Sequence, residues 1–482
     1  MLVFWLVAVP WVGLALFLLP RAWAKAGALV LALVEIVLFA AEWAGPRTAV
    51  NWNWIPEFGV HFHLAADGLG LFLIGLTVVV SAVVVLASPR DERPAYYVWI
   101  LVAESAALGV FLAQDLVTFY VFWEVVLIPI FFLLSGWARP NGRAAALRWL
   151  VMNLFGSFFM LIGVIAVGLI HQNQTGILTF QLASLAHTRF TGVAAPWIFL
   201  SFLVAFMIKA PLWPLHGWMP SAYGESPAPI TALISGVLSK LGVFAMLRVL
   251  VPLFFPEMHS WQPWLMALAA VGLVYGAVIA LRARDIKMVA SYSSLSHLAM
   301  ITLGIFTLTA AGAVGATFYM VAHGLMAGGL FLLLGWLERV TGQRDLTALS
   351  GLNRRLPRLS AWFQLFALAT LGLPGLAGFA GEYMIFQGLV RSNVTVAAVA
   401  GVVLIVASWY MIRLFQGAMQ STPRSGPTLS DLSWGQVGLI GVMGALVVLL
   451  GVWPASITGH VGSLVPTAYH ALSVGAKGGA SA

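Results

Sequence analysis

Several ionisable residues of this 482-residue sequence lie inside long apolar stretches, where a charge is costly. Glu124 stands in LVTFYVFWEVVLIPIFFLLSGW, and Lys240 stands in ITALISGVLSKLGVFAM. Lys209 precedes two prolines in FMIKAPLWPLHGWMP, and Glu382 follows the run LGLPGLAGFAG. Desolvation makes a buried lysine easier to deprotonate and a buried glutamate easier to protonate, so both types can exchange protons near neutral pH.

Three histidines extend this set. His297 lies in SYSSLSHLAM, His323 lies in TFYMVAHGLMAGG, and His216 follows the second proline of the broken stretch. His216 either joins the set or caps the broken helix, and the sequence leaves both readings open. A single Glu–Lys pair is explained by holding two helices together. A charged side chain at a helix centre costs about 2.5 to 3.5 kcal/mol. This sequence has two carboxylates, two lysines and a histidine on separate spans, and such a set favours a proton or ion path.

The composition predicts that these residues lie in a membrane. The chain is 61% hydrophobic and 8% charged, whereas soluble globular chains carry about 25% charged residues. Apolar runs of about 20 residues, enough to cross the hydrocarbon core as a helix, recur along most of the sequence. We expect an all-α polytopic membrane protein with about fourteen transmembrane helices.

Two of the expected spans, the seventh and the twelfth, contain internal breaks. Pro211 and Pro214 remove the helix hydrogen bonds to the carbonyls of Met207 and Ala210, on either side of Lys209. Pro374 and its neighbouring glycines interrupt the span before Glu382. Broken backbone at membrane depth is tolerated where it is buried in protein or lines a wet cavity. Paired broken helices also indicate two inverted repeats of five helices each.

The expected organisation is a single membrane domain, residues 1–482. It divides into N-terminal helices 1 to 3 in residues 1–95, a first repeat of helices 4 to 8 in residues 96–251, a second repeat of helices 9 to 13 in residues 263–418, and helix 14 in residues 433–454.

The basic residues set the expected orientation, because cytoplasmic loops near helix ends are enriched in Lys and Arg. Most of the 24 Lys and Arg residues, among them Arg139, Arg354 and Arg424, fall inside if both termini lie outside, whereas Arg47 and Lys477 are among the few outside. This bias explains the net charge of +8 by contact with anionic lipid and not with nucleic acid. The absence of cysteine excludes thiolate-held iron–sulfur clusters and Cys zinc sites on this chain.

Five segments together resemble the antiporter-like membrane subunits of respiratory complex I. They are FWEVVLIPIFFLLSGW, MIKAPLWPLHGWMPSAYGESPAPITALISGVLSKLG, DIKMVASYSSLSHLAM, MVAHGLMAGGLFLLLGWLER and LGLPGLAGFAGEYMIF. The resemblance runs over nearly the whole chain in the same order. Glu382 stands where two of the three sister subunits of the family usually carry lysine. In this respect the chain is similar to the third sister subunit.

The resemblance implies roles for the ionisable residues in a proton path. Glu124 would be the fifth-span glutamate, Lys209 the seventh-span lysine beside the break, and Lys240 the eighth-span connecting lysine. His297 and His323 would belong to a hydrated axis, with Glu382 as its terminal carboxylate.

The resemblance also implies cofactors and partners. No cofactor or metal would be bound by this chain, and NADH, flavin (FMN), iron–sulfur clusters and quinone would be bound by other subunits. Two sister antiporter-like subunits would be its neighbours in a bacterial inner membrane. MPSAY stands where the family often reads LPDAH, which puts a proton-entry role for Ser221 and Tyr223 in doubt. The alternatives are a membrane subunit of a sodium/proton antiporter or membrane-bound hydrogenase, and a scaffold subunit without transport.

Overall fold

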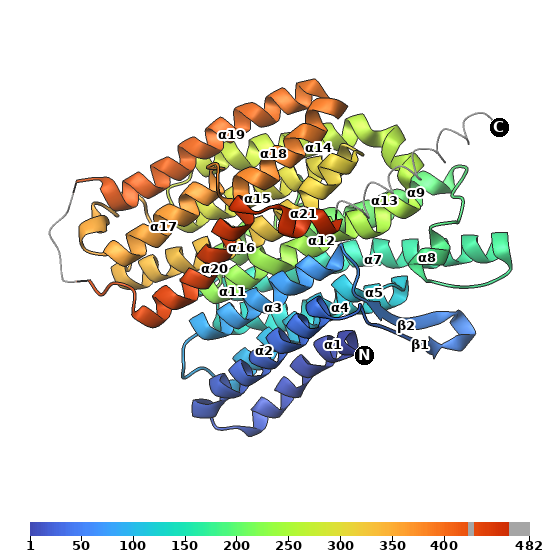
Figure 1. Ribbon diagram of the computed structural model, residues 1–482, viewed down its shortest axis with the longest axis horizontal. Coiled ribbons are helices and arrows are strands. Elements are labelled where there is room, and N and C mark those ends of the chain that lie inside the picture. The colour runs from blue at the N-terminus through green and yellow to red at the C-terminus, as the bar shows by residue number, and fades with distance from the viewer. Residues whose placement is uncertain (423–428, 462–482) are drawn as a thin grey trace. The chain divides into compact units, whose positions relative to one another are not determined.

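The computed structural model describes residues 1–422 and 429–461, and Figure 1 labels the elements. Arg424 and Lys477, two of the basic residues used to assign the orientation, lie outside the described residues. Helices dominate, as expected for an all-α membrane protein. Within the described residues, eleven helices are long and apolar enough to cross a membrane, and two shorter apolar helices, Leu2–Leu18 and Ala194–Lys209, accompany them. The number of fourteen spans and the inverted repeats stay predictions.

The chain forms two compact units. The first contains Met1–Ala210 and Val237–Trp261. In chain order its elements are α1 (Leu2–Val12), η1 (Gly13–Leu18), α2 (Arg21–Ala44), β1 (Ala49–Ile55), η2 (Pro56–Phe58), β2 (Val60–Ala65), α3 (Gly70–Ala87), α4 (Pro94–Leu112), α5 (Leu116–Val125), α6 (Leu127–Trp137), α7 (Gly142–Thr175), α8 (Leu182–Leu185), α9 (Ala194–Lys209), α12 (Ser239–Ala245), η4 (Met246–Leu250) and α13 (Val251–Leu253).

The second unit contains Pro211–Gly236 and the described residues from Gln262 onward. Its elements are α10 (Met219–Glu225), α11 (Ala228–Leu233), α15 (Ile286–Phe306), α16 (Ala310–Thr341), η5 (Leu352–Arg354), α17 (Pro357–Thr370), α18 (Ala377–Ser392), α19 (Val394–Phe415), η6 (Gln416–Gln420), α20 (Trp434–Val452) and α21 (Ala455–Val461). Two further helices, η3 (Ile234–Leu238) and α14 (Phe255–Arg282), cross the boundary between the units.

A β-hairpin in the first unit was not expected. Strands β1 and β2 pair antiparallel, and Gly59 turns the chain in the left-handed conformation with φ 62°. The strands are short, and β1, which exposes both Trp52 and Trp54, has no regular alternation of buried and exposed side chains that would mark it as a strand. The hairpin positions a membrane helix, since the backbone N–H of His61 on β2 donates to Asp115, the N-cap residue of α5.

Polar residues open the helices that carry the candidate residues. Asp115 accepts hydrogen bonds from the backbone of Val117 and Thr118 at the start of α5. Asp285 caps α15 in the same way. These caps satisfy backbone donors that a helix leaves open at its N-terminus. They therefore fix where each apolar helix begins.

The first unit also contains a partly buried ion pair. Arg248 on η4 pairs with Asp67, which precedes α3 and also accepts from the backbone N–H groups of Leu69 and Gly70. Burial raises the pKa of Asp67, but the guanidinium and the backbone donors outweigh it and hold that pKa below its ordinary value. These contacts make Asp67 a local helix cap and an ion-pair partner.

Candidate functional site

Glu124 lies at a break in its membrane span. Helix α5 ends at Val125 and α6 begins at Leu127. Pro129 causes this interruption, because it cannot donate a hydrogen bond to the carbonyl of Val125. The Glu124 side chain is half-buried, its Oε1 has no hydrogen-bond partner among the described residues, and the Ser157 hydroxyl of α7 lies nearby. A carboxyl group so placed can exchange a proton without first breaking a tight ion pair.

Lys209 is the last residue of α9, and the chain then turns through residues 210–218 before α10 begins. This confirms the predicted break in the seventh span. The side chain is only 3% exposed. Its Nζ donates to the carbonyl of Trp123 at 3.4 Å and lies 4.8 Å from the centroid of that indole. The ammonium and the Glu124 carboxylate attract each other through space.

Lys240 is wholly buried on α12 and donates to the hydroxyl of Ser239 at 3.3 Å. Its span is not a regular helix, because the π-helical turns η3 and η4 flank α12. Such turns inside α-helices often mark functional sites. Gly242 brings the same helix against α9, since a Cβ there would lie 2.4 Å from the carbonyl oxygen of Phe206. The close approach holds Lys240 on a helix packed against the end of α9 that carries Lys209.

The second unit brings His297, Tyr319 and Glu382 into one hydrogen-bonded chain. The Tyr319 hydroxyl donates to Glu382 Oε1 at 2.6 Å and lies 2.5 Å from Nδ1 of His297. All three side chains are buried. His297 lies on α15, Tyr319 on α16 and Glu382 on α18. With a proton on Nδ1 of His297, the imidazole donates to the phenol oxygen of Tyr319, and the phenol O–H donates to the Glu382 carboxylate. This order permits a proton to pass from His297 to Glu382 by two short transfers.

His323 adjoins this chain. Its ring centroid lies 5.6 Å from that of His297, and both rings line a small cavity with Ser293, Ser294 and Thr370. The space open to the centre of a water molecule there is about 10 Å³, which is about the room that one water needs. The cavity thus places polar groups from several helices around a volume of single-water size.

Glu382 also depends on the predicted break in the twelfth span. Helix α17 ends at Thr370 and α18 begins at Ala377, so the break is confirmed. Gly372, within it, has φ 81°, and a Cβ at this position would lie 2.4 Å from Glu382 Oε2. A glycine is required here both for the left-handed backbone and for the space that the carboxyl group occupies.

His216 contacts a different neighbour. It lies in the turn before α10, its exposed fraction is 9%, and its ring packs edge to face on Tyr275 with centroids 5.1 Å apart. The structure thus gives His216 an aromatic contact on α14, and its place in the proton path stays a prediction.

The sequence reasoning missed Tyr319, which joins His297 to Glu382. A signal was present, because Tyr319 and His323 are four residues apart in TFYMVAHG and therefore share one face of their helix. Because a phenol is uncharged at neutral pH, Tyr319 does not stand out from an apolar stretch as a lysine or a glutamate does.

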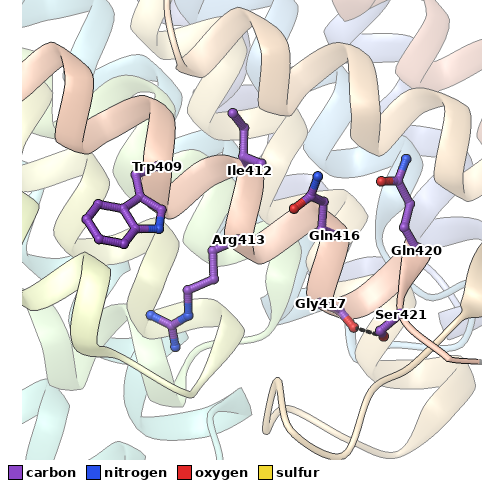
Figure 2. A pocket seen from close by; sticks show the side chains of 7 residues that line it. All are labelled: Trp409, Ile412, Arg413, Gln416, Gly417, Gln420 and Ser421. Atoms are coloured by element: carbon purple, nitrogen blue, oxygen red, sulfur yellow. Dashed lines mark hydrogen bonds between the residues drawn. The ribbon is translucent and has the colours of Figure 1, made fainter.

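A larger surface groove offers no comparable chemistry. It measures about 560 Å³ and lies along α19 and η6, lined by Trp409, Ile412, Arg413, Gln416, Gly417, Gln420 and Ser421 (Figure 2). Arg413 is its single ionisable side chain, and its guanidinium donates to the backbone carbonyls of Leu281 and Ala283. The groove therefore lacks the convergent ionisable groups of the buried sets.

Comparison with known proteins identifies the family. Residues 113–408, more than half of the chain, match the family model described as NADH:quinone oxidoreductase/Mrp antiporter, TM. The chain belongs to this family. The matched residues include every candidate residue of both units, from Glu124 to Glu382.

Relatives within the family share most of the chain's length. NADH-quinone oxidoreductase subunit M of Mycobacterium tuberculosis is 33% identical over 94% of this chain and 90% of its own. The protein of the same name from Escherichia coli K12 is 32% identical over 94% of this chain and 89% of its own. A chain of respiratory complex I from Thermus thermophilus, solved with bound NADH, is 33% identical, with a TM-score of 0.90 over 98% of this chain and 100% of its own.

A second solved complex shares the fold. A chain of the Mrp complex from Dietzia sp. has a TM-score of 0.87 at 21% identity, covering 97% of each chain. At this identity the likeness supports the fold alone. The multi-helix membrane architecture is therefore common to both branches of the family.

Proposed function

We propose that this chain is a proton-translocating subunit of an NADH:quinone oxidoreductase. The observation that carries the proposal is two sets of ionisable residues, all buried except the half-buried Glu124. Glu124, Lys209 and Lys240 lie in one unit, and His297, His323 and Glu382 lie in the other. Relatives named NADH-quinone oxidoreductase subunit M, alike over nearly their full length, support the assignment. A scaffold subunit would need the apolar faces but none of these groups.

In the first unit the Glu124 carboxylate controls the charge of Lys209. Two unit charges about 10 Å apart attract by about 1.7 kcal/mol at an effective dielectric constant of about 20. Protonation of Glu124 removes that attraction. The equilibrium constant for proton release from the buried ammonium then rises by at least about tenfold. The carbonyl of Trp123 and the two indole faces that surround Lys209 hold the cation in position meanwhile.

In the second unit the proton moves along fixed hydrogen bonds. His297 starts the step as an imidazolium, protonated on both ring nitrogens. It gives its Nδ1 proton to the Tyr319 oxygen while the Tyr319 hydroxyl proton passes to Glu382 Oε1, which leaves His297 neutral. Glu382 ends the line and must lose its proton before the next transfer. His323 reprotonates His297 through a water molecule in the cavity between them.

The energy and the redox cofactors come from elsewhere in the complex. NADH, flavin (FMN), iron–sulfur clusters and quinone bind to other subunits, and among the described residues no group of three or more His, Asp or Glu side chains is arranged to hold a metal ion. The partners are other membrane subunits of the complex, including two sister antiporter-like subunits. The chain lies in a bacterial inner membrane with both termini on the outer side.

The test uses the assembled complex in inverted membrane vesicles. Lys209→Ala and Glu124→Ala should each strongly reduce NADH-driven proton pumping and quinone reduction while the complex still assembles. Lys25→Ala is a matched control, because Lys25 is bound to backbone carbonyls of Leu86 and Ser88, outside both sets. Native pumping in either test variant at equal assembly would count against the proposal.

The sodium/proton antiporter alternative is separated by the same preparation. If the chain copurifies with quinone-reductase subunits and pumping needs NADH, the oxidoreductase assignment holds. Sodium-driven proton exchange without NADH would favour the antiporter instead.

A further inference from the structure

Two glutamates face each other in the N-terminal helices, apart from the residues of the proposed function. Glu35 lies near the middle of α2 and Glu104 near the middle of α4, and both are wholly buried. They lie close enough for their charges to influence each other through space. Within residues 1–422 and 429–461, none of their four carboxyl oxygens has a hydrogen-bond partner.

The burial of Glu35 is specific to that position. Its neighbours on α2, Leu33, Val34, Ile36 and Val37, are between 38% and 66% exposed, as expected for the lipid-facing side of a membrane helix. Glu35 itself is wholly buried, on a helix that packs against α1, α3 and α4. An acidic residue turned inward against another acidic residue is costly unless a bound ligand offsets the charge.

A third polar group completes the site. Ser81 on α3 is wholly buried, its hydroxyl lies beside the Glu104 carboxyl, and among the described residues it has no hydrogen bond with good geometry. A hydroxyl and two carboxyl groups therefore converge from three helices. Each of them has unused hydrogen-bonding capacity.

No cation of the surrounding helices balances the two carboxyl groups. The sequences of α1, η1 and α3 contain no ionisable side chain, and α4 adds only Tyr96 and Tyr97. On α2, Arg21 and Lys25 lie in the first turns, where Lys25 binds backbone carbonyls.

The remaining ionisable groups on packed helices belong to other contacts. On α2 itself, Glu42 is bound to Thr48. Helices α5 and α12, which also pack against α4, carry Glu124 and Lys240, but the polar interactions of Glu104 are with Glu35 and Ser81. Two adjacent carboxylates that lack a neutralising cation cannot both stay ionised in a low-dielectric site.

We propose that Glu35, Glu104 and Ser81 form a proton-binding site, in which the two carboxyl groups share one proton and take up a second on acidification. In the singly protonated state, the O–H of one carboxyl donates to the carboxylate of the other, and the Ser81 hydroxyl donates to a remaining oxygen. The second proton neutralises the carboxylate. The inference concerns the resting protein and does not rest on the proposed function.

The test is infrared spectroscopy of the assembled, resting complex. The area of the protonated-carboxyl C=O band is measured in the native complex and in the double variant Glu35→Gln/Glu104→Gln. At neutral pH the double variant should lose one carboxyl equivalent, and in acid it should lose two. Asp67→Asn is the control, because Arg248 and the backbone N–H groups of Leu69 and Gly70 hold the pKa of the Asp67 carboxyl below its ordinary value, so this variant should lose none at neutral pH.

Other losses at neutral pH would overturn the proposal. A loss of two equivalents means that both groups are permanently neutral and serve packing alone. If no carboxyl equivalent is lost, both groups are ionised. A protonated-carboxyl band that appears only when sodium is replaced by choline would then identify a cation site. If the double variant does not assemble, Ser81→Ala supplies the measurement, since it should shift the frequency of the band while its area stays the same. An unshifted band would contradict the site.

Discussion

Replacing Tyr319 by phenylalanine tests the hydrogen-bonded chain of the second unit. The change removes one oxygen, which lies 2.5 Å from His297 Nδ1 and 2.6 Å from Glu382 Oε1. Without it, those two atoms remain 3.6 Å apart, beyond the 2.7 to 3.2 Å range of a good N–H···O hydrogen bond. The ring itself is retained, so the packing should change little.

The expected effect follows from the lost hydrogen bond. A hydrogen bond to a charged group contributes about 1.5 to 3 kcal/mol, and about 1.4 kcal/mol corresponds to a factor of ten in rate. Proton transfer from His297 to Glu382 should therefore slow by about 10- to 150-fold. We expect NADH-driven proton pumping to fall by at least about tenfold where this step limits turnover.

The assay is quenching of a pH-sensitive dye in inverted vesicles after addition of NADH, with assembly checked on native gels. Tyr410→Phe is the control, because it removes another buried phenol of the same unit, one that bonds Ser293 at 2.9 Å. Native pumping in Tyr319→Phe at equal assembly would refute the proton route through Tyr319. Equal losses in both variants would instead indicate a general effect of removing buried hydroxyls.

Three further predictions follow from local contacts. Gly242→Val should lower the free energy of unfolding of the subunit by about 1 to 3 kcal/mol, because its Cβ would lie 2.4 Å from a backbone oxygen of α9. The control Gly438→Val should leave the free energy of unfolding unchanged, because a Cβ there meets nothing within 4 Å. Asp67→Asn should lower the melting temperature at neutral pH, because Arg248 stabilises the carboxylate. The native pKa of Asp67 lies below its ordinary 3.8. The stability contributed by the carboxylate is therefore present above pH 3.8 and is lost as the pH falls through the native pKa. A difference in melting temperature between Asp67→Asn and the native protein that persists in strong acid would contradict this explanation. Glu382→Gln should abolish pumping without loss of assembly, since an amide still accepts from Tyr319 but carries no proton, and pumping by this variant would exclude Glu382 as a carrier.

The sequence predicted the membrane fold and the two breaks because both follow from local chemistry. Apolar length is visible in composition, and the prolines around Lys209 and before Glu382 interrupt a helix whatever surrounds it. The break after Glu124 followed the same rule through Pro129, yet it was not predicted. The π-helical turns around Lys240 have no comparable local signal, because they arise from packing between helices.

Contacts between helices were harder to predict. In a membrane, both the lipid-facing and the buried sides of a helix are apolar, so the side that faces inward is weakly encoded. For this reason the sequence did not show that Glu35 and Glu104 face each other, although both lie within expected spans. The joining of His297 to Glu382 through Tyr319 likewise required the packing of α15, α16 and α18.

The most direct test of the central claim is a map of the assembled complex at a resolution that shows single water molecules. The account predicts an ordered water between His297 and His323, and further waters that link Glu124 to Lys209. Dry apolar packing at both places, with no solvent bridging the ionisable side chains, would contradict proton conduction through these residues.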